Sequence, residues 1–254
     1  DGSAGELSKF TFIADDAGVA SAFLLSTIPA DWQKESTITA LVIGKSVTSI
    51  GSDAFYGCHG ITNITINSVN SIGGGAFRAC YGLTNINLNS ITSFNGYYAF
   101  AETGATTVNI NNCPNIGNYM FWYSQNLANV NLNQVISIGN NAFEACDSLT
   151  SITFPNTLTS IGTYAFWDSG LTSLSLPSSV TSIGNYAFKQ CFDLVTIAAI
   201  GSASIGSSSF YGCSALTTVN ILNTVTFIGS YAFYGCSNLT TVNCYAEKAI
   251  FDVS

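Results

Sequence analysis

The 254-residue chain has few charges. Only 8% of its residues are Asp, Glu, Lys or Arg, against about 25% in an ordinary soluble domain. Six basic residues face fourteen acidic ones, which gives a net charge of −8. Because DNA, RNA and anionic bilayers are bound through basic patches, this composition excludes a nucleic-acid partner. Hydrophobic residues make up 47% of the chain, which is enough for a core, so the low charge does not indicate disorder.

Histidine is also scarce, since His59 is the only one. A His-rich metal site or a Ser/His/Asp centre needs partners that a single histidine lacks. We therefore expect no enzyme activity, with no catalytic residues, no metal and no cofactor. The uncharged stretch 17–30 is too short and too polar to span a bilayer, which predicts no membrane insertion by this segment. The amino terminus lacks a signal-peptide pattern, so we expect that any signal has been removed.

One short phrase recurs through the chain and ends each time in phenylalanine. The copies read SIGSDAF, SIGGGAF, SFNGYYAF, NIGNYMF, SIGNNAF, SIGTYAF, SIGNYAF, SIGSSSF and FIGSYAF, and they end at Phe55, Phe77, Phe100, Phe121, Phe143, Phe166, Phe188, Phe210 and Phe233. Their mean spacing of about 22 residues lies in the range of leucine-rich repeats and is too short for helical-pair repeats.

A second phrase, such as LTNINL at 83–88, follows each phenylalanine and alternates apolar and polar residues as a strand does. Ten strands are predicted, beginning near Ile38, Ile61, Leu83, Ala105, Leu127, Leu149, Leu171, Leu194, Leu216 and Leu239. Because each strand returns to the same phase one coil later, the sheet must be parallel. The predicted fold is a leucine-rich-repeat solenoid with this sheet on one face and loops and short turns elsewhere.

Equivalent positions of successive coils should stack into columns inside the solenoid. The phenylalanines form the largest column, and valines three positions before the repeat isoleucine form another. The residue before the phenylalanine is alanine except at Met120 and Ser209, and its small size is expected to make room where the turn passes close to the next coil. The glycine after the isoleucine is expected either to adopt a positive φ or to allow a close backbone approach.

The run VTSIGNYAFKQCFDLVTI, 180–197, resembles the BspA-like class of leucine-rich repeats, whose units read approximately LxxIxLPxxVTSIGxxAFxxC. The resemblance covers nearly 38–244, although the proline after the strand survives only at Pro155 and Pro177. It implies a secreted or surface-attached protein linked with adhesion to host proteins or other cells. No catalytic residues come with it.

Six of the eight cysteines lie three residues after the repeat phenylalanine, where the other copies have Thr or Ser. Their side chains should point the same way in successive coils, which is poor geometry for a disulfide. We predict buried free thiols that pack as small hydrophobic residues, and we place Cys113 and Cys244 in the core as well. Spacing of about 22 residues does not suit a zinc site.

The acidic residues of the mid-chain are the remaining candidates for chemistry. Glu144, Asp147, Asp168 and Asp193 occupy different phases, so convergence on a glycosidase or calcium site is not implied and solvated surface charges are expected. His59 is predicted to be an exposed turn residue.

Two surfaces are candidates for binding. The outward strand positions form uncharged polar columns, among them Asn85, Asn87, Asn109, Asn129 and Asn131. These side chains either satisfy one another and water, which we favour, or bind sugars and backbone amides. The second surface carries aromatics two before and one after the phenylalanine, concentrated in mid-chain at Trp122, Tyr123, Tyr164 and Trp167. Tyr and Trp are favoured anchors at interfaces.

The chain divides into an acidic, non-repeating N-terminal cap at 1–37, the solenoid of about nine repeats at 38–244, and a C-terminal cap or cut end at 245–254. The predicted function is that of an extracellular or cell-surface, non-enzymatic binding module. Its predicted partner is a protein of a host or neighbouring cell. A carbohydrate-binding module that uses the asparagine face and the exposed aromatics, or an inert stalk, is the alternative.

Overall fold

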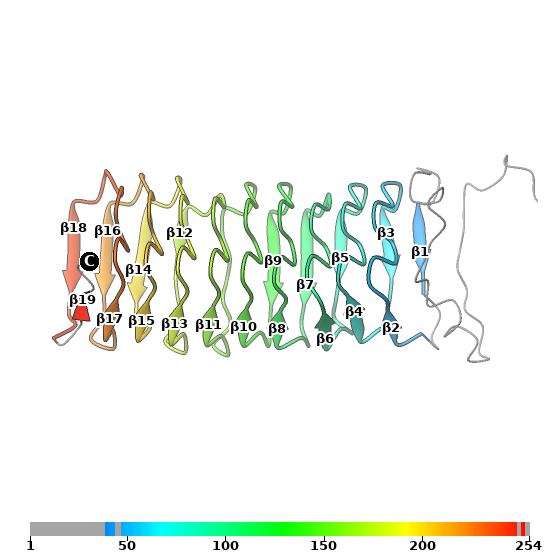
Figure 1. The fold of residues 1–254 in the computed structure, drawn as a ribbon, viewed down its shortest axis with the longest axis horizontal. Helices are drawn as coiled ribbons and strands as arrows, with labels where there is room; N and C mark the ends of the chain where they lie inside the picture. Colours follow the sequence, from blue (N-terminus) through cyan, green and yellow to red (C-terminus); the bar gives the residue numbers. More distant parts are fainter. Residues whose placement is uncertain (1–38, 44–46, 248–249, 252–254) are drawn as a thin grey trace, which may run out of the picture.

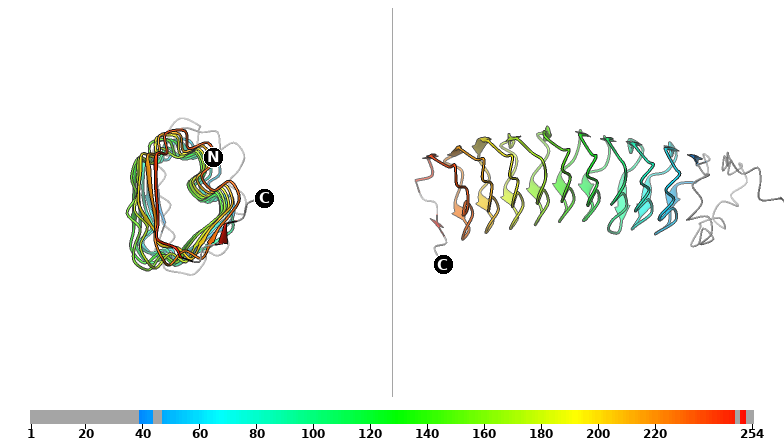
Figure 2. Two further views of the ribbon diagram at one scale, coloured as in Figure 1. Left: turned by 90° about the vertical axis from the view of Figure 1, so that its left-hand side faces the viewer. Right: turned by 90° about the horizontal axis from the view of Figure 1, so that it is seen from above.

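The computed structural model describes residues 39–43, 47–247 and 250–251, which form an elongated parallel β-solenoid (Figure 1). Seen along its axis, successive coils superimpose as one closed outline (Figure 2). The predicted solenoid is confirmed. The predicted N-terminal cap, 1–37, lies outside the described residues, and the assignment of 245–254 to a C-terminal cap stays a prediction.

The first row of strands contains nine of the ten predicted ones and carries the Asn/Thr/Ser columns. It consists of β1 (Ala40–Val42), β3 (Asn63–Thr65), β5 (Asn85–Asn87), β7 (Thr107–Ile110), β9 (Asn129–Leu132), β12 (Ser173–Leu174), β14 (Thr196–Ile200), β16 (Thr218–Ile221) and β18 (Thr241–Cys244). The strand predicted to begin near Leu149 is absent from the described coil. The gap coincides with Phe154, an aromatic in a column that otherwise holds Ile and Leu in the neighbouring coils.

A second row of short parallel strands runs through the SIG phrases, where the sequence predicted only loops and turns. It consists of β2 (Ser49–Ile50), β4 (Ser71–Gly73), β6 (Ser93–Asn95), β8 (Asn115–Ile116), β10 (Ser137–Ile138), β11 (Ser160–Ile161), β13 (Ser182–Ile183), β15 (Ser204–Ile205), β17 (Phe227–Ile228) and β19 (Ile250–Phe251). Equivalent positions pair in register, as Ile138 does with Ile161 and Ile72 with Phe94. The row is interrupted between β6 and β8, where the phrase SFNGYYAF is one residue longer than the other copies.

The repeat phenylalanines form one continuous stack between the two rows. Neighbouring ring centroids are 5.1 to 6.0 Å apart and the rings are within 17° of parallel. The backbone stacks too, since the Phe143 amide donates to the Ala165 carbonyl of the next coil at 2.8 Å. The rings from Phe77 to Phe210 are completely buried, so this column is the centre of the core.

The repeat glycines allow a close approach between coils and do not need a positive φ. A Cβ atom on Gly162 would lie 2.7 Å from the backbone of the preceding coil at Gly139 and Asn140. Positive φ values lie instead two residues before and two residues after every repeat phenylalanine, between 53° and 76°. At these positions the chain turns sharply around the ring, and most of them are not glycine.

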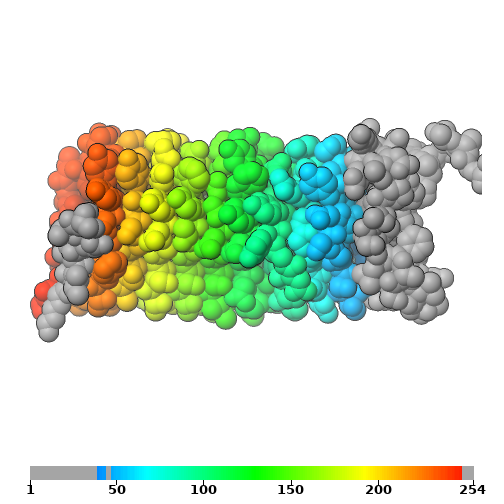
Figure 3. Space-filling view, viewed as in Figure 1, coloured from blue at the N-terminus to red at the C-terminus, as the bar shows by residue number. Residues whose placement is uncertain are grey.

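None of the described residues belongs to a helix with the length and hydropathy that a bilayer crossing requires. Side chains of successive coils pack in contact along the body (Figure 3). Cys113 is buried as predicted, but the placement of Cys244 in the core is wrong, because it lies exposed on the edge strand β18.

Candidate functional site: an aromatic ridge

The cysteines that lie three residues after the repeat phenylalanine form a thiol column, and most of their side chains hydrogen-bond to the backbone. Its members are Cys58, Cys80, Cys146, Cys191, Cys213 and Cys236. All eight cysteines are free thiols. The sequence suggested that small size is what this position requires, but the structure shows a second requirement, a hydrogen-bond donor. Cys80 Sγ donates to the Phe55 carbonyl of the preceding coil at 3.1 Å, and Ser124 Oγ donates to that of Phe100 at 3.2 Å. Cys, Ser and Thr all meet that requirement.

Burial raises the pKa of these thiols, except at Cys191, where hydrogen bonds with Cys213 and Ser169 outweigh burial and lower the pKa. Burial raises the pKa of Cys58 and of Cys236 to about 11, and it raises the pKa of the more deeply buried Cys80 and Cys146 further. The thiolate is the form that attacks electrophiles and binds metals. Within the described part of the chain, no three His, Cys, Asp or Glu side chains gather as a metal site would require.

Among the described residues the mid-chain carboxylates do not gather into a group of three, although burial and the neighbouring charge of Asp168 raise the pKa of Asp147. Asp147, Asp168 and Asp193 are exposed, as predicted. Glu144 is not, and its assignment as a solvated surface charge is wrong: it is 7% exposed and accepts a hydrogen bond from the Asn141 side chain. At the same position of the two neighbouring coils, Trp122 and Trp167 are partly exposed, whereas Glu144 is buried.

The asparagine face is partly satisfied by its own side chains. Asn131 Nδ2 donates to Asn109 Oδ1 at 2.7 Å, one coil away. Asn85 donates to the Thr84 hydroxyl, and Asn87 accepts from the Asn89 amide. Asn129 is exposed on β9 beside them. The amides remain partly free to bind, so their role in ligand binding stays a prediction, while their ladder explains why asparagine suits this face.

The aromatic ridge, defined as the side chains two before and one after each repeat phenylalanine, is the more distinctive surface. Its aromatic members are Tyr56, Tyr98, Tyr119, Trp122, Tyr164, Trp167, Tyr186, Tyr211, Tyr231 and Tyr234. Five of these tyrosines have a positive φ of 57° to 64°. An L-residue other than glycine rarely adopts that conformation, so the backbone orients these rings at a cost of about 1–2 kcal/mol each.

The ridge is divided into two clusters. In the first, the ridge residue Trp122 contacts Tyr123, which lies just outside the ridge two residues after Phe121, at 4.5 Å between ring centroids. In the second, Tyr164 and Trp167 contact each other at 5.2 Å. The two pairs do not form one patch, because the coil of Phe143, with Asn141 and Glu144 on the ridge, lies between them. The mid-chain concentration that the sequence indicated is therefore two neighbouring patches.

Each cluster continues along the ridge on the side away from the coil of Phe143. Tyr98 stacks on Tyr119 at 4.5 Å and meets Trp122 edge-on at 5.9 Å. On the other side Tyr164 stacks on Tyr186 at 4.7 Å. Burial, with a contribution from neighbouring phenols, raises the pKa of Tyr98 and of Tyr164, so these hydroxyls remain protonated hydrogen-bond donors at neutral pH.

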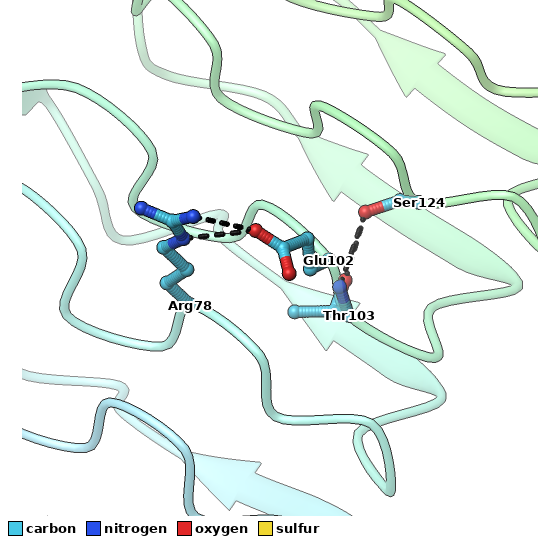
Figure 4. A network of polar contacts seen from close by, with 4 residues as sticks. All are labelled: Arg78, Glu102, Thr103 and Ser124. Atoms are coloured by element: carbon cyan, nitrogen blue, oxygen red, sulfur yellow. Dashed lines mark hydrogen bonds and ion pairs between the residues drawn. The ribbon is translucent and has the colours of Figure 1, made fainter.

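Both described basic residues lie on the ridge, and the sequence analysis did not single them out. Arg78 lies over the rings of Tyr56, Tyr98 and Trp122 at 5.0 to 6.0 Å. Glu102 on the next coil neutralises it through Nε and Nη2, at 2.9 and 2.8 Å (Figure 4). The sequence already showed a sign of this, because Arg78 and Lys189 both directly follow a repeat phenylalanine in a chain with only six Lys and Arg residues.

Lys189 occupies the equivalent position in the second cluster. Its ammonium lies 5.2 to 5.6 Å from the ring centroids of Trp167, Tyr186 and Tyr211. A cation held over several ring faces is attracted to each of them. The ridge therefore presents rigid aromatic faces, phenol and indole donors and fixed cations, which is the composition of a binding surface.

Comparison with known proteins agrees with the stacked columns. The model of the BspA type leucine-rich repeat region matches residues 26–137 and 114–240, in six copies. The chain belongs to the BspA-type leucine-rich-repeat family. This family consists of repeat proteins that act as protein-interaction modules. No curated protein matches the sequence.

Two solved structures show the same architecture as this family member. A leucine-rich repeat protein from Bacteroides ovatus is 27% identical with a TM-score of 0.58, and the match covers 85% of this chain and 63% of that one. The T. pallidum leucine-rich repeat protein is also 27% identical, with a TM-score of 0.55, over 58% of this chain and 73% of that one. This chain thus spans less than two thirds of the Bacteroides ovatus protein.

Proposed function

We propose that this BspA-type solenoid is a non-enzymatic adhesion module, displayed outside the cell, that binds a protein on a host or neighbouring cell through the aromatic ridge. The ridge is the observation that carries the proposal. Its rings are held by stacking and by a left-handed backbone, so little side-chain entropy is lost when a partner binds. Family membership supports an interaction role, and the scarcity of surface charge suits contact with an uncharged protein surface.

The test uses beads coated with the chain and monolayers of cultured epithelial cells. The Trp122→Ala/Trp167→Ala double variant removes one anchor from each cluster. Because central aromatic anchors contribute about 2 kcal/mol or more each, attachment should fall at least about tenfold. Tyr81→Ala is the matched control, since Tyr81 is equally aromatic and 56% exposed but lies outside the ridge.

Mild trypsin treatment of the cells tests the kind of partner. Attachment should be lost after trypsin if the partner is a protein, and it should survive enzymatic removal of surface glycans. Attachment of the double variant at the wild-type level would overturn the ridge as the binding surface. Attachment that resists trypsin but is lost with the glycans would overturn the protein partner in favour of a carbohydrate.

A further inference from the structure

The two basic residues of the ridge differ in how their charge is satisfied. Arg78 and Lys189 both directly follow a repeat phenylalanine, and each lies over three rings. Arg78 pairs with Glu102, which stands two residues after the phenylalanine of the next coil. Among the described residues, no carboxylate lies within ion-pair distance of Lys189. The ammonium therefore has unused donors.

The sequence shows what replaces the carboxylate beside Lys189. The position equivalent to Glu102, two residues after Phe210, is Gly212. It has a φ of 74°, and Glu102 has a φ of 57°, so both belong to the same left-handed turn. The turn does not itself exclude a side chain, because Glu102, Tyr123, Asp168 and Gln190 all occupy it elsewhere. A Cβ atom on Gly212 would meet its nearest neighbour, Gln190, at an ordinary 3.4 Å.

A cavity of about 310 Å³ lies next to this position. Its walls are the ridge side chains of three consecutive coils, Tyr186, Lys189, Ser208, Tyr211, Tyr231 and Tyr234. Tyr211 stacks on Tyr234 at 5.2 Å, and Tyr231 meets Tyr234 edge-on at 5.8 Å, so the rings form fixed walls. This volume is at the lower end of the range for small-molecule pockets, which suits one small ligand ring.

We propose that this cavity binds a sugar residue that carries a carboxylate, of the uronate or sialate type. The carboxylate would take the place beside Lys189 that Glu102 takes beside Arg78, as a charge-assisted hydrogen-bond acceptor. Aromatic faces bury the apolar face of a sugar ring, and the phenols of four tyrosines with the Ser208 hydroxyl match its hydroxyl groups as donors and acceptors. Neither Trp122 nor Trp167 lines this pocket, although the Trp167 ring lies 5.2 Å from the Lys189 ammonium.

The experiment titrates the folded chain with methyl β-D-glucuronoside and follows amide NMR shifts at Tyr211, Gly212 and Tyr234. Methyl β-D-glucoside is the neutral probe of the same shape. The glucuronoside should bind with a Kd on the order of 1 mM, and the glucoside at least about tenfold more weakly. Lys189→Gln should abolish that preference. N-acetylglutamate α-methylamide, which keeps the side-chain carboxylate, serves as the acidic peptide probe and should not bind in the same range.

Gly212→Glu is the decisive variant, because it supplies an internal carboxylate to Lys189 in the way that Glu102 does to Arg78. It should prevent glucuronoside binding, whereas Gly212→Gln, with nearly the same volume and no charge, should retain most of it. Thermal unfolding of each variant separates lost binding from lost folding, and Lys189→Gln provides an independent result if Gly212→Glu does not fold.

Three results would overturn the proposal: equal affinity for the glucoside and the glucuronoside, an unchanged Kd in Lys189→Gln, or binding of the glutamate probe alone. The last would assign the cavity to an acidic peptide. Because binding is measured on the isolated chain with a small probe, failure here leaves the adhesion test on cells unaffected, and the reverse also holds.

Discussion

Two neighbouring columns of the same turn contrast sharply. The repeat phenylalanine is present in every described coil and is stacked on its equivalents. The next residue along the chain is different from coil to coil: Tyr56, Arg78, Ala101, Trp122, Glu144, Trp167, Lys189, Tyr211 and Tyr234. The inner column must match itself, because each ring packs on the one before it. The outer column rests on that backbone and is free to vary, so chemistry specific to this protein accumulates there.

The largest effect should follow from breaking the inner column. Phe143→Ala removes a fully buried ring that stacks on Phe121 and Phe166, and it should lower the free energy of unfolding by about 3–5 kcal/mol. Phe233→Ala is the matched control at the last described repeat, where the ring is only partly buried and stacks on Phe210. Its cost should be less than half as large in urea unfolding. Equal costs would show that the column does not act as a stack.

A smaller loss of stability should follow from adding a methyl group at a repeat glycine, where two coils approach closely. Gly162→Ala would place a methyl group 2.7 Å from the backbone of the preceding coil, which cannot move without shifting a strand. We expect a loss of about 1–3 kcal/mol. At the same phase, Gly117→Ala would meet the end of the flexible Met120 side chain at 3.0 Å, so its cost should be clearly lower. If the two variants have the same midpoint in thermal unfolding, close approach is not the reason for glycine here.

The smallest effect should come from substitutions at the positions of positive φ, two residues before and two residues after the repeat phenylalanine. Ala145 has a φ of 53°, and Ala145→Gly relieves a strain of about 1–2 kcal/mol while it loses part of one buried methyl group. We expect a net gain of up to about 1 kcal/mol. The reverse change, Gly235→Ala at a φ of 76°, should destabilise by about the same amount. Calorimetric midpoints that move in the same direction for both variants would contradict this account.

Much of the interior could be predicted because in a solenoid the sequence period and the spatial period are the same. The parallel strands, the phenylalanine column and the burial of Cys80 and Cys146 all follow from phase alone. The second strand row was missed because two residues of SIG give no alternation to detect. The burial of Glu144 was missed for another reason, since a carboxylate on a coil surface is covered only when the neighbouring coils carry larger side chains.

The sequence predicted which kinds of residue form the candidate site, but not which of them contact one another. Counting aromatics indicated the ridge, yet Trp122 and Trp167 proved to lie on separate clusters, with the coil of Glu144 between them. The cavity at Lys189 depends on what is absent two residues after Phe210, and a glycine in a chain with 23 glycines attracts no notice until Glu102 is seen pairing with Arg78.

The amino-acid sequence by itself determined the period, the direction of the strands and most of the residues that face inward, because a repeat that cannot bury its apolar side alone must stack on its neighbours in phase. Only the tertiary structure decided which outer side chains meet. Contacts between coils join residues about 22 positions apart, and whether such a pair makes an ion pair, a ring stack or an open cavity depends on side-chain size and direction at both ends.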